Sequence, residues 1–134
     1  MTLKELSQLY YLNREIEKDK ERLADLRSRA AGFSPSSLSG PPHGNGSGSK
    51  IERIIEDIVD LEAIILAKQE ACIHERNRLE HWIADIDDSL LRMIFALRFV
   101  DCLSWRQVAF HIGNNTEDSV KKACYRYLKN ERKE

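Results

Sequence analysis

The clearest chemical signal in the chain is a basic run close to its C-terminal end. Lys122, Arg126 and Lys129 follow the three- and four-residue spacing that gathers side chains on one face of a helix, with Lys121 at the edge of that face. Cations of this density bind phosphate groups, and a polar, basic helical face suits the major groove of DNA. The candidate DNA-binding residues are completed by polar side chains on the same helix: Thr116, Asp118, Ser119 and Tyr125.

The first turn of this helix is where sequence specificity would reside. In helix-turn-helix proteins the first residues of the recognition helix meet base edges, which here are Thr116, Asp118 and Ser119. Asp118 has two possible roles. It can accept a hydrogen bond from a cytosine amino group, or it can stabilise the positive end of the helix dipole.

A charged helical face on its own is more often solvated surface, so the preceding elements decide the interpretation. Ser104 is positioned to cap a helix with apolar residues at Trp105, Val108 and Ile112. The triplet Gly113-Asn114-Asn115 then breaks the periodicity, since these residue types tolerate a left-handed conformation. Thr116 caps the next helix, whose apolar stripe is Val120, Ala123, Cys124, Tyr127 and Leu128. Two short helices joined by such a turn predict a helix-turn-helix.

Residues 88 to 128 resemble the fourth conserved region of bacterial sigma factors. The resemblance rests on Leu97-Arg98-Phe99, Leu103-Ser104, Val108-Ala109, Ile112-Gly113 and Val120 with its two following lysines. The chain as a whole is similar to small phage-encoded transcriptional regulators, the ArpU/RinA kind of late-gene activators. It departs from the sigma pattern by one extra residue between Gly113 and Val120, which changes the expected entry angle of the last helix.

The resemblance implies a sequence-specific, double-stranded-DNA-binding transcriptional activator in the cytoplasm of a bacterial host, with RNA polymerase as a further partner. Two alternatives stay open. One is a small phage packaging (terminase) subunit that uses the same fold to recognise viral DNA. The other is an adaptor that docks on RNA polymerase without reading DNA.

The remainder of the chain predicts an all-α protein with long helices. Thr2 and Glu5 form a capping-box pattern that starts a first amphipathic helix over residues 1–31. Ser49 and Glu52 form a second, opening another long helix over residues 51–86. Between them, residues 32–50 hold all three prolines and five of the six glycines, which is typical of a linker. The helix-turn-helix domain is expected over residues 87–134.

Both long helices carry an apolar seam at heptad-like spacing. Polar residues interrupt these seams at Asp19, Lys68 and Glu75. The seams can close on each other within one chain, or they can form an oligomerisation module, for which symmetry favours a homodimer. The candidate oligomerisation residues are Leu9, Leu12, Ile16, Leu23, Leu26, Ile51, Ile54, Ile58, Leu61 and Ile65.

The distribution of charge supports the same division of the chain. The formal net charge of the whole is −1, but residues 87–134 carry nine Lys/Arg against seven Asp/Glu, a balance of +2. The preceding residues therefore sum to −3. Positive potential gathers where the recognition helix is expected.

We predict no catalytic residues, no cofactor and no metal site. Cys72, Cys102 and Cys124 stand alone in apolar surroundings, which is typical of buried thiols in a reducing cytoplasm. His74 and His81 share a helical face without a third ligand at suitable spacing. The acidic run Asp85, Asp87 and Asp88 is expected to end one helix, with Asp87 capping the next. No apolar run is long enough for a membrane span.

Overall fold

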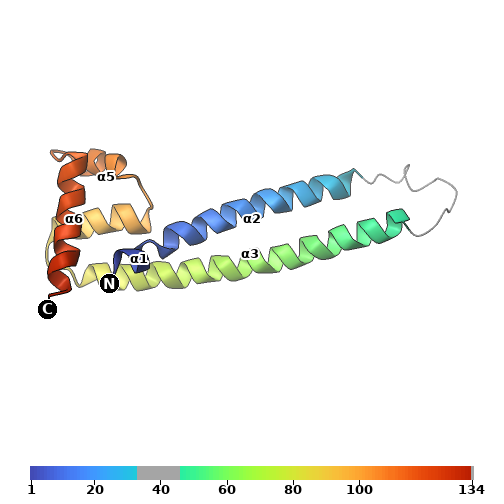
Figure 1. Ribbon diagram of the computed structural model, residues 1–134, viewed down its shortest axis with the longest axis horizontal. Coiled ribbons are helices and arrows are strands. Elements are labelled where there is room, and N and C mark those ends of the chain that lie inside the picture. The colour runs from blue at the N-terminus through green and yellow to red at the C-terminus, as the bar shows by residue number, and fades with distance from the viewer. Residues whose placement is uncertain (33–45, 134) are drawn as a thin grey trace. The chain divides into compact units, whose positions relative to one another are not determined.

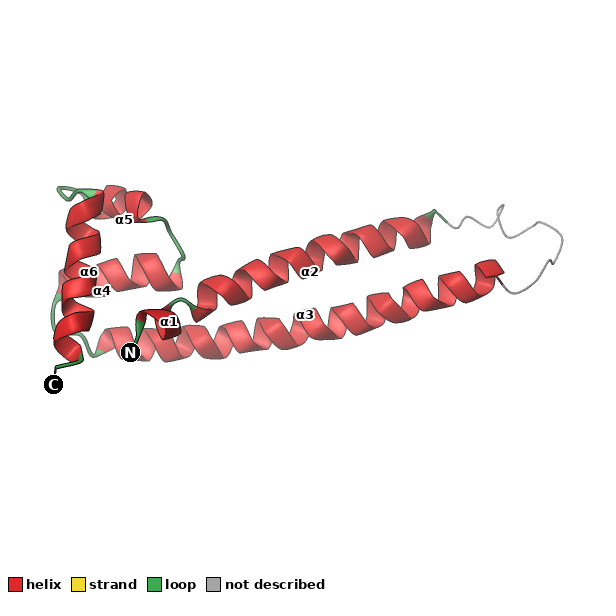
Figure 2. Cartoon of the chain, in the orientation of Figure 1, coloured by secondary structure: helices red, strands yellow, loops and turns green. Residues whose placement is uncertain are grey.

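The computed structural model describes residues 1–32 and 46–133, and within these ranges it contains helices and no strands (Figure 2). The prediction of an all-α fold is confirmed. Most of the predicted linker, residues 33–45, lies outside the described residues. The elements in order are α1 (Leu3–Leu6), α2 (Gln8–Ala31), α3 (Gly46–Ala84), α4 (Ser89–Phe95), the π-helix η2 (Ala96–Val100), α5 (Trp105–Ile112) and α6 (Glu117–Glu131) (Figure 1).

The chain divides into two compact units. One is formed by residues 14–70 and the other by residues 1–13 together with residues 71–134. The helices α2 and α3 each contribute residues to both units. The first is called the hairpin unit and the second the helix-turn-helix unit.

The predicted capping box at the N-terminus is present, but the helix that follows is broken. The Thr2 backbone N–H donates to Glu5 Oε2 at 2.7 Å, and the Glu5 N–H donates to Thr2 Oγ1 at 3.2 Å. The hydrogen bond from the Thr2 backbone lowers the pKa of the Glu5 carboxyl. Instead of one helix over residues 1–31, α1 ends at Leu6 and its C-cap Ser7 separates it from α2; the Ser7 hydroxyl donates to the Leu3 carbonyl at 2.8 Å. A side chain that bonds the preceding turn in this way competes with the helical backbone.

The second capping box was a wrong prediction. The helix α3 begins at Gly46, so Ser49 lies inside its first turn, and residues 46–50 belong to the helix and not to the linker. Extending an existing helix by one residue adds one hydrogen bond for one residue ordered, so a long helix can continue through weak helix formers. The capping pattern is local and carries no information about that extension.

In the hairpin unit, α2 and α3 lie side by side and run in opposite directions (Figure 1). Ile16, Leu23 and Leu26 of α2 are buried, as are Leu61 and Ile65 of α3. The two seams therefore close on each other within one chain. Of the predicted oligomerisation residues in this unit, these five are buried, while Ile51, Ile54 and Ile58 are half-buried.

Polar interruptions of the two seams meet in the hairpin unit. Lys68 Nζ lies 2.6 Å from Asp19 Oδ2 and 3.5 Å from Glu15 Oε2. The hydrogen bond to Asp19 is the main cause that raises the pKa of Lys68. A second link joins Arg27 Nη2 and Glu62 Oε1 at 2.8 Å. Asp19 and Lys68, which interrupt the apolar seams of the two helices, thus pair across the hairpin.

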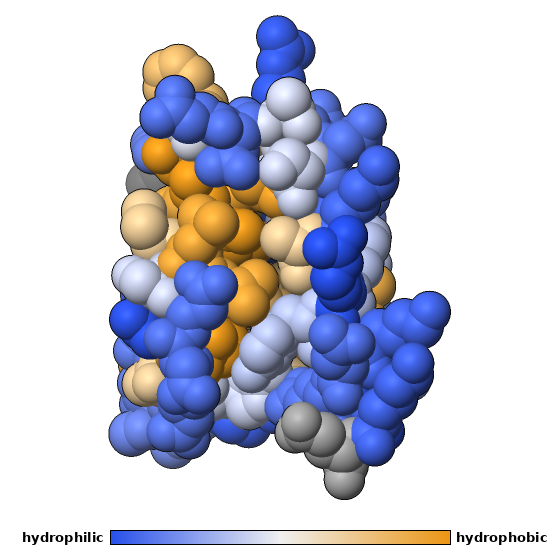
Figure 3. Space-filling view, turned by 90° about the vertical axis from the view of Figure 1, so that its left-hand side faces the viewer, coloured by the Kyte–Doolittle hydropathy of each residue, from blue (hydrophilic) through white to orange (hydrophobic). Residues whose placement is uncertain are grey.

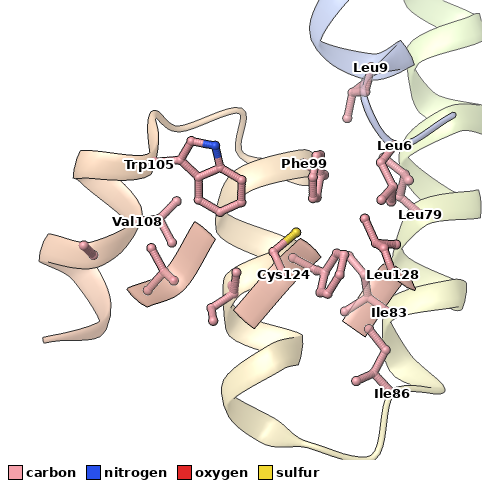
Figure 4. Packing of buried hydrophobic residues seen from close by; sticks show 14 residues of the cluster. Leu6, Leu9, Leu79, Ile83, Ile86, Phe99, Trp105, Val108, Cys124 and Leu128 are labelled. Carbon is pink, nitrogen blue, oxygen red and sulfur yellow. The ribbon is translucent and has the colours of Figure 1, made fainter. Parts of the chain in front are cut away.

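The helix-turn-helix unit is organised around one apolar cluster (Figure 4). The side chain of Phe95 is fully buried, and its ring centroid lies 5.2 Å from that of Trp82, 5.6 Å from Phe99 and 5.6 Å from Tyr127. The buried cluster comprises Leu6, Leu9, Leu79, Ile83, Ile86, Ile94, Phe95, Phe99, Trp105, Val108, Ala109, Val120, Cys124 and Leu128.

This cluster extends across the domain boundary that was predicted at residue 87. Leu6 and Leu9 come from the N-terminal helices, and Leu79 and Ile83 come from the end of α3. Leu12, another predicted oligomerisation residue, is half-buried in this unit. A core of three short helices alone would be marginal, and the additional residues enlarge the apolar area that it buries.

Candidate nucleic-acid interface

The helix α5 is held at both ends by the residues that the sequence indicated. At its start, the Gln107 N–H donates to Ser104 Oγ at 3.2 Å, and the Ser104 N–H donates to Gln107 Oε1 at 2.9 Å. At its end, Gly113 has φ 75° and Asn114 has φ 55°. Both are in the left-handed region, as predicted for this turn. The Asn115 side chain then donates to the Gly113 carbonyl at 3.0 Å and stabilises the reversal.

Two of the predicted site residues build the start of α6. Thr116 is the N-cap, and its Oγ1 accepts from the Ser119 N–H at 3.1 Å. The Ser119 hydroxyl donates to Asn115 Oδ1 at 3.1 Å. These bonds tie the turn to the first turn of α6, so Thr116 and Ser119 position this helix in addition to lying on its exposed side.

The helix α6 has two contrasting faces. Val120, Cys124 and Leu128 are buried in the apolar cluster, which fixes the rotation of the helix about its axis. All eight predicted DNA-binding residues are exposed: Thr116, Asp118, Ser119, Lys121, Lys122, Tyr125, Arg126 and Lys129. The structure therefore brings four cationic side chains together on the solvent side of one helix.

Tyr125 is less free than the other members of this set. Its ring centroid lies 6.1 Å from that of Trp105, on the preceding helix α5. The Arg98 guanidinium in turn stacks over the Trp105 ring, with Cζ 4.7 Å from the centroid, while its Nη1 donates to the Leu103 carbonyl at 2.9 Å. The sequence did not predict this arrangement, in which Arg98 stacks on Trp105 and Trp105 in turn contacts Tyr125.

An apolar hollow of about 230 Å³ lies between α4 and α6. Figure 3 looks onto the side on which α6 lies and shows apolar surface among hydrophilic side chains. Leu90, an apolar residue of α4, is 40% exposed. The residues that line the hollow are Asp88, Leu90, Leu91, Ala123, Arg126, Tyr127 and Asn130, so Arg126 belongs both to the hollow and to the basic face.

A second feature missed by sequence reasoning is Phe110 on α5. Its side chain is 84% exposed, more than any other large apolar residue that the structure describes. Its ring meets the His111 ring, with centroids 6.0 Å apart. The sequence offers only one signal for it, because position 110 falls outside the apolar stripe of α5 formed by Trp105, Val108 and Ile112.

The start of α4 differs from the prediction by one residue. Asp88, not Asp87, is the N-cap, and its carboxylate accepts from the Leu90 N–H at 2.8 Å. Asp87 uses its carbonyl to accept from Arg92 Nη1 at 3.0 Å, and the same nitrogen bonds the Ile86 carbonyl at 2.6 Å. Either aspartate suits a cap by type, and the path of the chain out of α3 selects Asp88.

None of the three thiols is among the residues of the candidate interface. Burial raises the pKa of the Cys124 thiol to about 12 and also raises the pKa values of Cys72 and Cys102. His74 and His81 are both exposed on α3. Within residues 1–32 and 46–133, no three metal-binding side chains gather, and no helix is long and apolar enough to cross a membrane.

Comparison of the chain with protein-family models, with curated proteins and with solved structures finds no match.

Proposed function

We propose that this protein is a sequence-specific, double-stranded-DNA-binding transcriptional regulator that uses α6 as its recognition helix. One observation carries the proposal. The buried stripe Val120, Cys124 and Leu128 turns the opposite side of α6 to solvent, and that side holds Lys122, Arg126 and Lys129, with exposed Lys121 at its edge. A helix docked in this way by its apolar side, after a short capped turn, has the arrangement that enters the major groove in helix-turn-helix proteins.

Each part of the exposed side has a distinct role in this proposal. The lysines and the arginine contact phosphate oxygens and supply most of the affinity. The first turn, with Asp118, reads base edges. The resemblance to phage late-gene activators of the ArpU/RinA kind supports activation of transcription as the biological role, in a bacterial cytoplasm and with RNA polymerase as a further partner.

The proposal is tested by selection from a randomised duplex DNA library. The wild-type chain should enrich a defined motif, and the Lys121→Ala/Lys122→Ala/Arg126→Ala variant should enrich none. Asp118→Asn keeps a favourable polar residue in the first turn, so a changed motif assigns Asp118 to base reading, and an unchanged motif assigns it to the helix dipole. Failure of the wild-type chain to enrich any motif would contradict sequence-specific binding.

The DNA fragment in which the selected motif occurs distinguishes two roles of the same interface. A motif at a late promoter supports the activator, whereas a motif at the packaging site supports a terminase small subunit. A gel shift with both fragments, at one salt concentration, makes the comparison direct because phosphate-mediated affinity depends steeply on salt.

A second candidate function is docking on RNA polymerase without DNA reading. The 84% exposure of Phe110 and the apolar hollow beside α6 favour it, since exposed apolar surface marks protein contacts. Phe110→Ala should abolish co-purification with the polymerase core and leave the DNA motif intact. Loss of both, in a chain that still folds, would place Phe110 in the DNA interface instead.

A further inference from the structure

The outer side of α3 in the hairpin unit carries a row of exposed apolar side chains. Ile55 is 50% exposed, Val59 58% and Leu66 59%. At about 100° per residue, the three fall within an arc of about 40° around the helix. The buried residues Leu61 and Ile65 lie roughly 100° to 140° away on the same helix. We call Ile55, Val59 and Leu66 the outer stripe, and it is a second apolar face of α3.

The spacing of the outer stripe indicates what covers it. Val59 and Leu66 are seven residues apart, and Ile55 precedes Val59 by four. Apolar residues at this spacing form a stripe along one side of the helix. Such a stripe packs against a second helix that runs alongside, as in a coiled coil. Glu62 and Gln69 occupy the intervening seam positions, where polar residues lower the stability of a helix pair and define its register.

The two borders of the outer stripe differ in charge. On the side away from α2, the exposed residues Glu52, Glu56 and Glu70 follow the stripe. On the side toward α2, the seam residue Glu62 binds Arg27 of α2 at 2.8 Å. Lys20 is seven residues before Arg27 and therefore lies on the same side of α2. One border is acidic, and the other lies beside two cations of α2, Lys20 and Arg27.

We propose that the outer stripe packs against the outer stripe of a second copy of this chain, with the two α3 helices parallel. In a parallel pair, the left border of each helix faces the right border of its partner. Glu56 and Glu70 of each copy then lie near the levels of Arg27 and Lys20 of the other, twice over by symmetry, whereas Glu52 lies further from both. An antiparallel pair would place the glutamate rows against each other.

This arrangement uses a different surface from the seam residues predicted for oligomerisation, six of which are buried and four half-buried within each chain. It also has a consequence at the C-terminal end of α3, because Ala84 is followed closely by α4 at Ser89. Parallel pairing brings both chains out of α3 at the same end of the dimer. The proposal does not rest on DNA binding.

Sedimentation equilibrium of the full chain measures the pairing without DNA. A standard interface buries about 800 Å² per partner, more than three side chains expose, so we expect a dissociation constant in the micromolar range. Leu66→Glu should raise that constant about tenfold or more, since it places a charge in an apolar seam. Ile64→Glu is the matched control, because Ile64 is 47% exposed on the opposite side of α3. Circular dichroism verifies that both variants remain helical.

A wild-type chain that stays monomeric up to about 100 μM would overturn the proposal, since micromolar pairing is expected. Equal effects of Leu66→Glu and Ile64→Glu would also overturn it, because they would place the contact elsewhere. A dimer that persists in the Leu66→Glu variant would likewise overturn the proposal and place the contact elsewhere. None of these results depends on whether α6 binds DNA.

Cross-linking tests the orientation. Ile55→Cys and Leu66→Cys, made separately, should each give an intermolecular disulfide under mild oxidation, because in a parallel pair each position meets its own copy. The wild-type chain, with its three thiols, is the control for background cross-linking. An antiparallel pair brings at most one of the two positions next to itself, so cross-linking at only one would contradict the parallel arrangement.

Discussion

The two units of this protein are both helical, yet they are stabilised in different ways. The helix-turn-helix unit surrounds a shared aromatic centre with residues from every one of its helices, and Phe95 has no exposed surface. The hairpin unit has two helices that share one apolar seam, with ion pairs at Lys68–Asp19 and Arg27–Glu62. A helix that packs on one side leaves its other sides available. The first unit can therefore hold a surface rigidly, whereas the second offers faces for another helix.

The largest effect expected from this difference is in the aromatic centre. Phe95→Ala should lower the free energy of unfolding by about 3–5 kcal/mol, since it removes a buried ring and leaves a cavity. Leu23→Ala in the hairpin should cost less, because a two-helix seam can close over a smaller side chain. Urea unfolding followed by circular dichroism compares the two. Equal losses would show that the hairpin is as tightly packed as the other unit.

The clearest pH effect on stability is expected in the helix-turn-helix unit. Burial raises the pKa of Cys124 from 9.0 to about 12, so between these values the thiol ionises in the unfolded chain and stays neutral in the folded one. Its contribution to stability is complete below pH 9 and should then fall by up to about 1.4 kcal/mol per pH unit. Urea unfolding from pH 8 to 11 measures this slope. Cys124→Ala should flatten it, and an unchanged slope would assign the effect to another group.

The turn before α6 should show a smaller cost. Gly113 has φ 75°, a conformation that costs a residue with a Cβ roughly 1 kcal/mol, so Gly113→Ala should destabilise the protein by about that amount. No atom lies within 4 Å of the added Cβ, which makes backbone strain the cause. Asn114→Gly is the matched control at φ 55°, and it should not lower the melting temperature by a comparable amount.

The smallest effect is expected at the ion pair of the hairpin. Asp19→Ala should lower the melting temperature slightly, since Lys68 keeps Glu15 at 3.5 Å. Asp19→Leu with Lys68→Leu should restore or raise it, because an apolar pair continues the seams on both helices. The raised pKa of Lys68 means that its contribution is present below about pH 10.5 and is lost at higher pH. A double variant less stable than Asp19→Ala would show that the pair is required for the hairpin.

Local features were predictable from the sequence because their causes are local. Thr2, Ser104 and Thr116 cap helices through bonds to residues three positions on, and Gly113 with Asn114 reverses the chain. The division of α6 into buried and exposed sides follows from its periodicity in the same way. These features form the candidate interface, so most of its residues could be named in advance.

Features that depend on distant contacts were not predictable. Nothing near Leu6 or Leu79 shows that these residues complete the core around Phe95, because that requires the N-terminal helices and the end of α3 to meet the same cluster. The π-helix Ala96–Val100 widens the helical turn, so that the Asp101 N–H bonds the Ala96 carbonyl at 3.0 Å. Phe99, in this wide turn, is buried in the core. The exposure of Leu90 also depends on distant contacts, since periodicity alone does not show how far a neighbouring helix extends.

The most direct test of the central claim is the salt dependence of DNA binding, measured by fluorescence anisotropy with one duplex. The full chain is compared with Lys121→Ala/Lys122→Ala/Arg126→Ala and with Lys18→Ala/Arg22→Ala/Arg53→Ala, which removes the same charge from exposed positions of the hairpin unit. Each phosphate contact contributes about one unit to the slope of log affinity against log salt. We predict that the α6 variant loses about three units of slope and that the hairpin variant keeps the wild-type slope. Equal slopes for all three proteins would contradict the assignment of α6 as the DNA-binding surface.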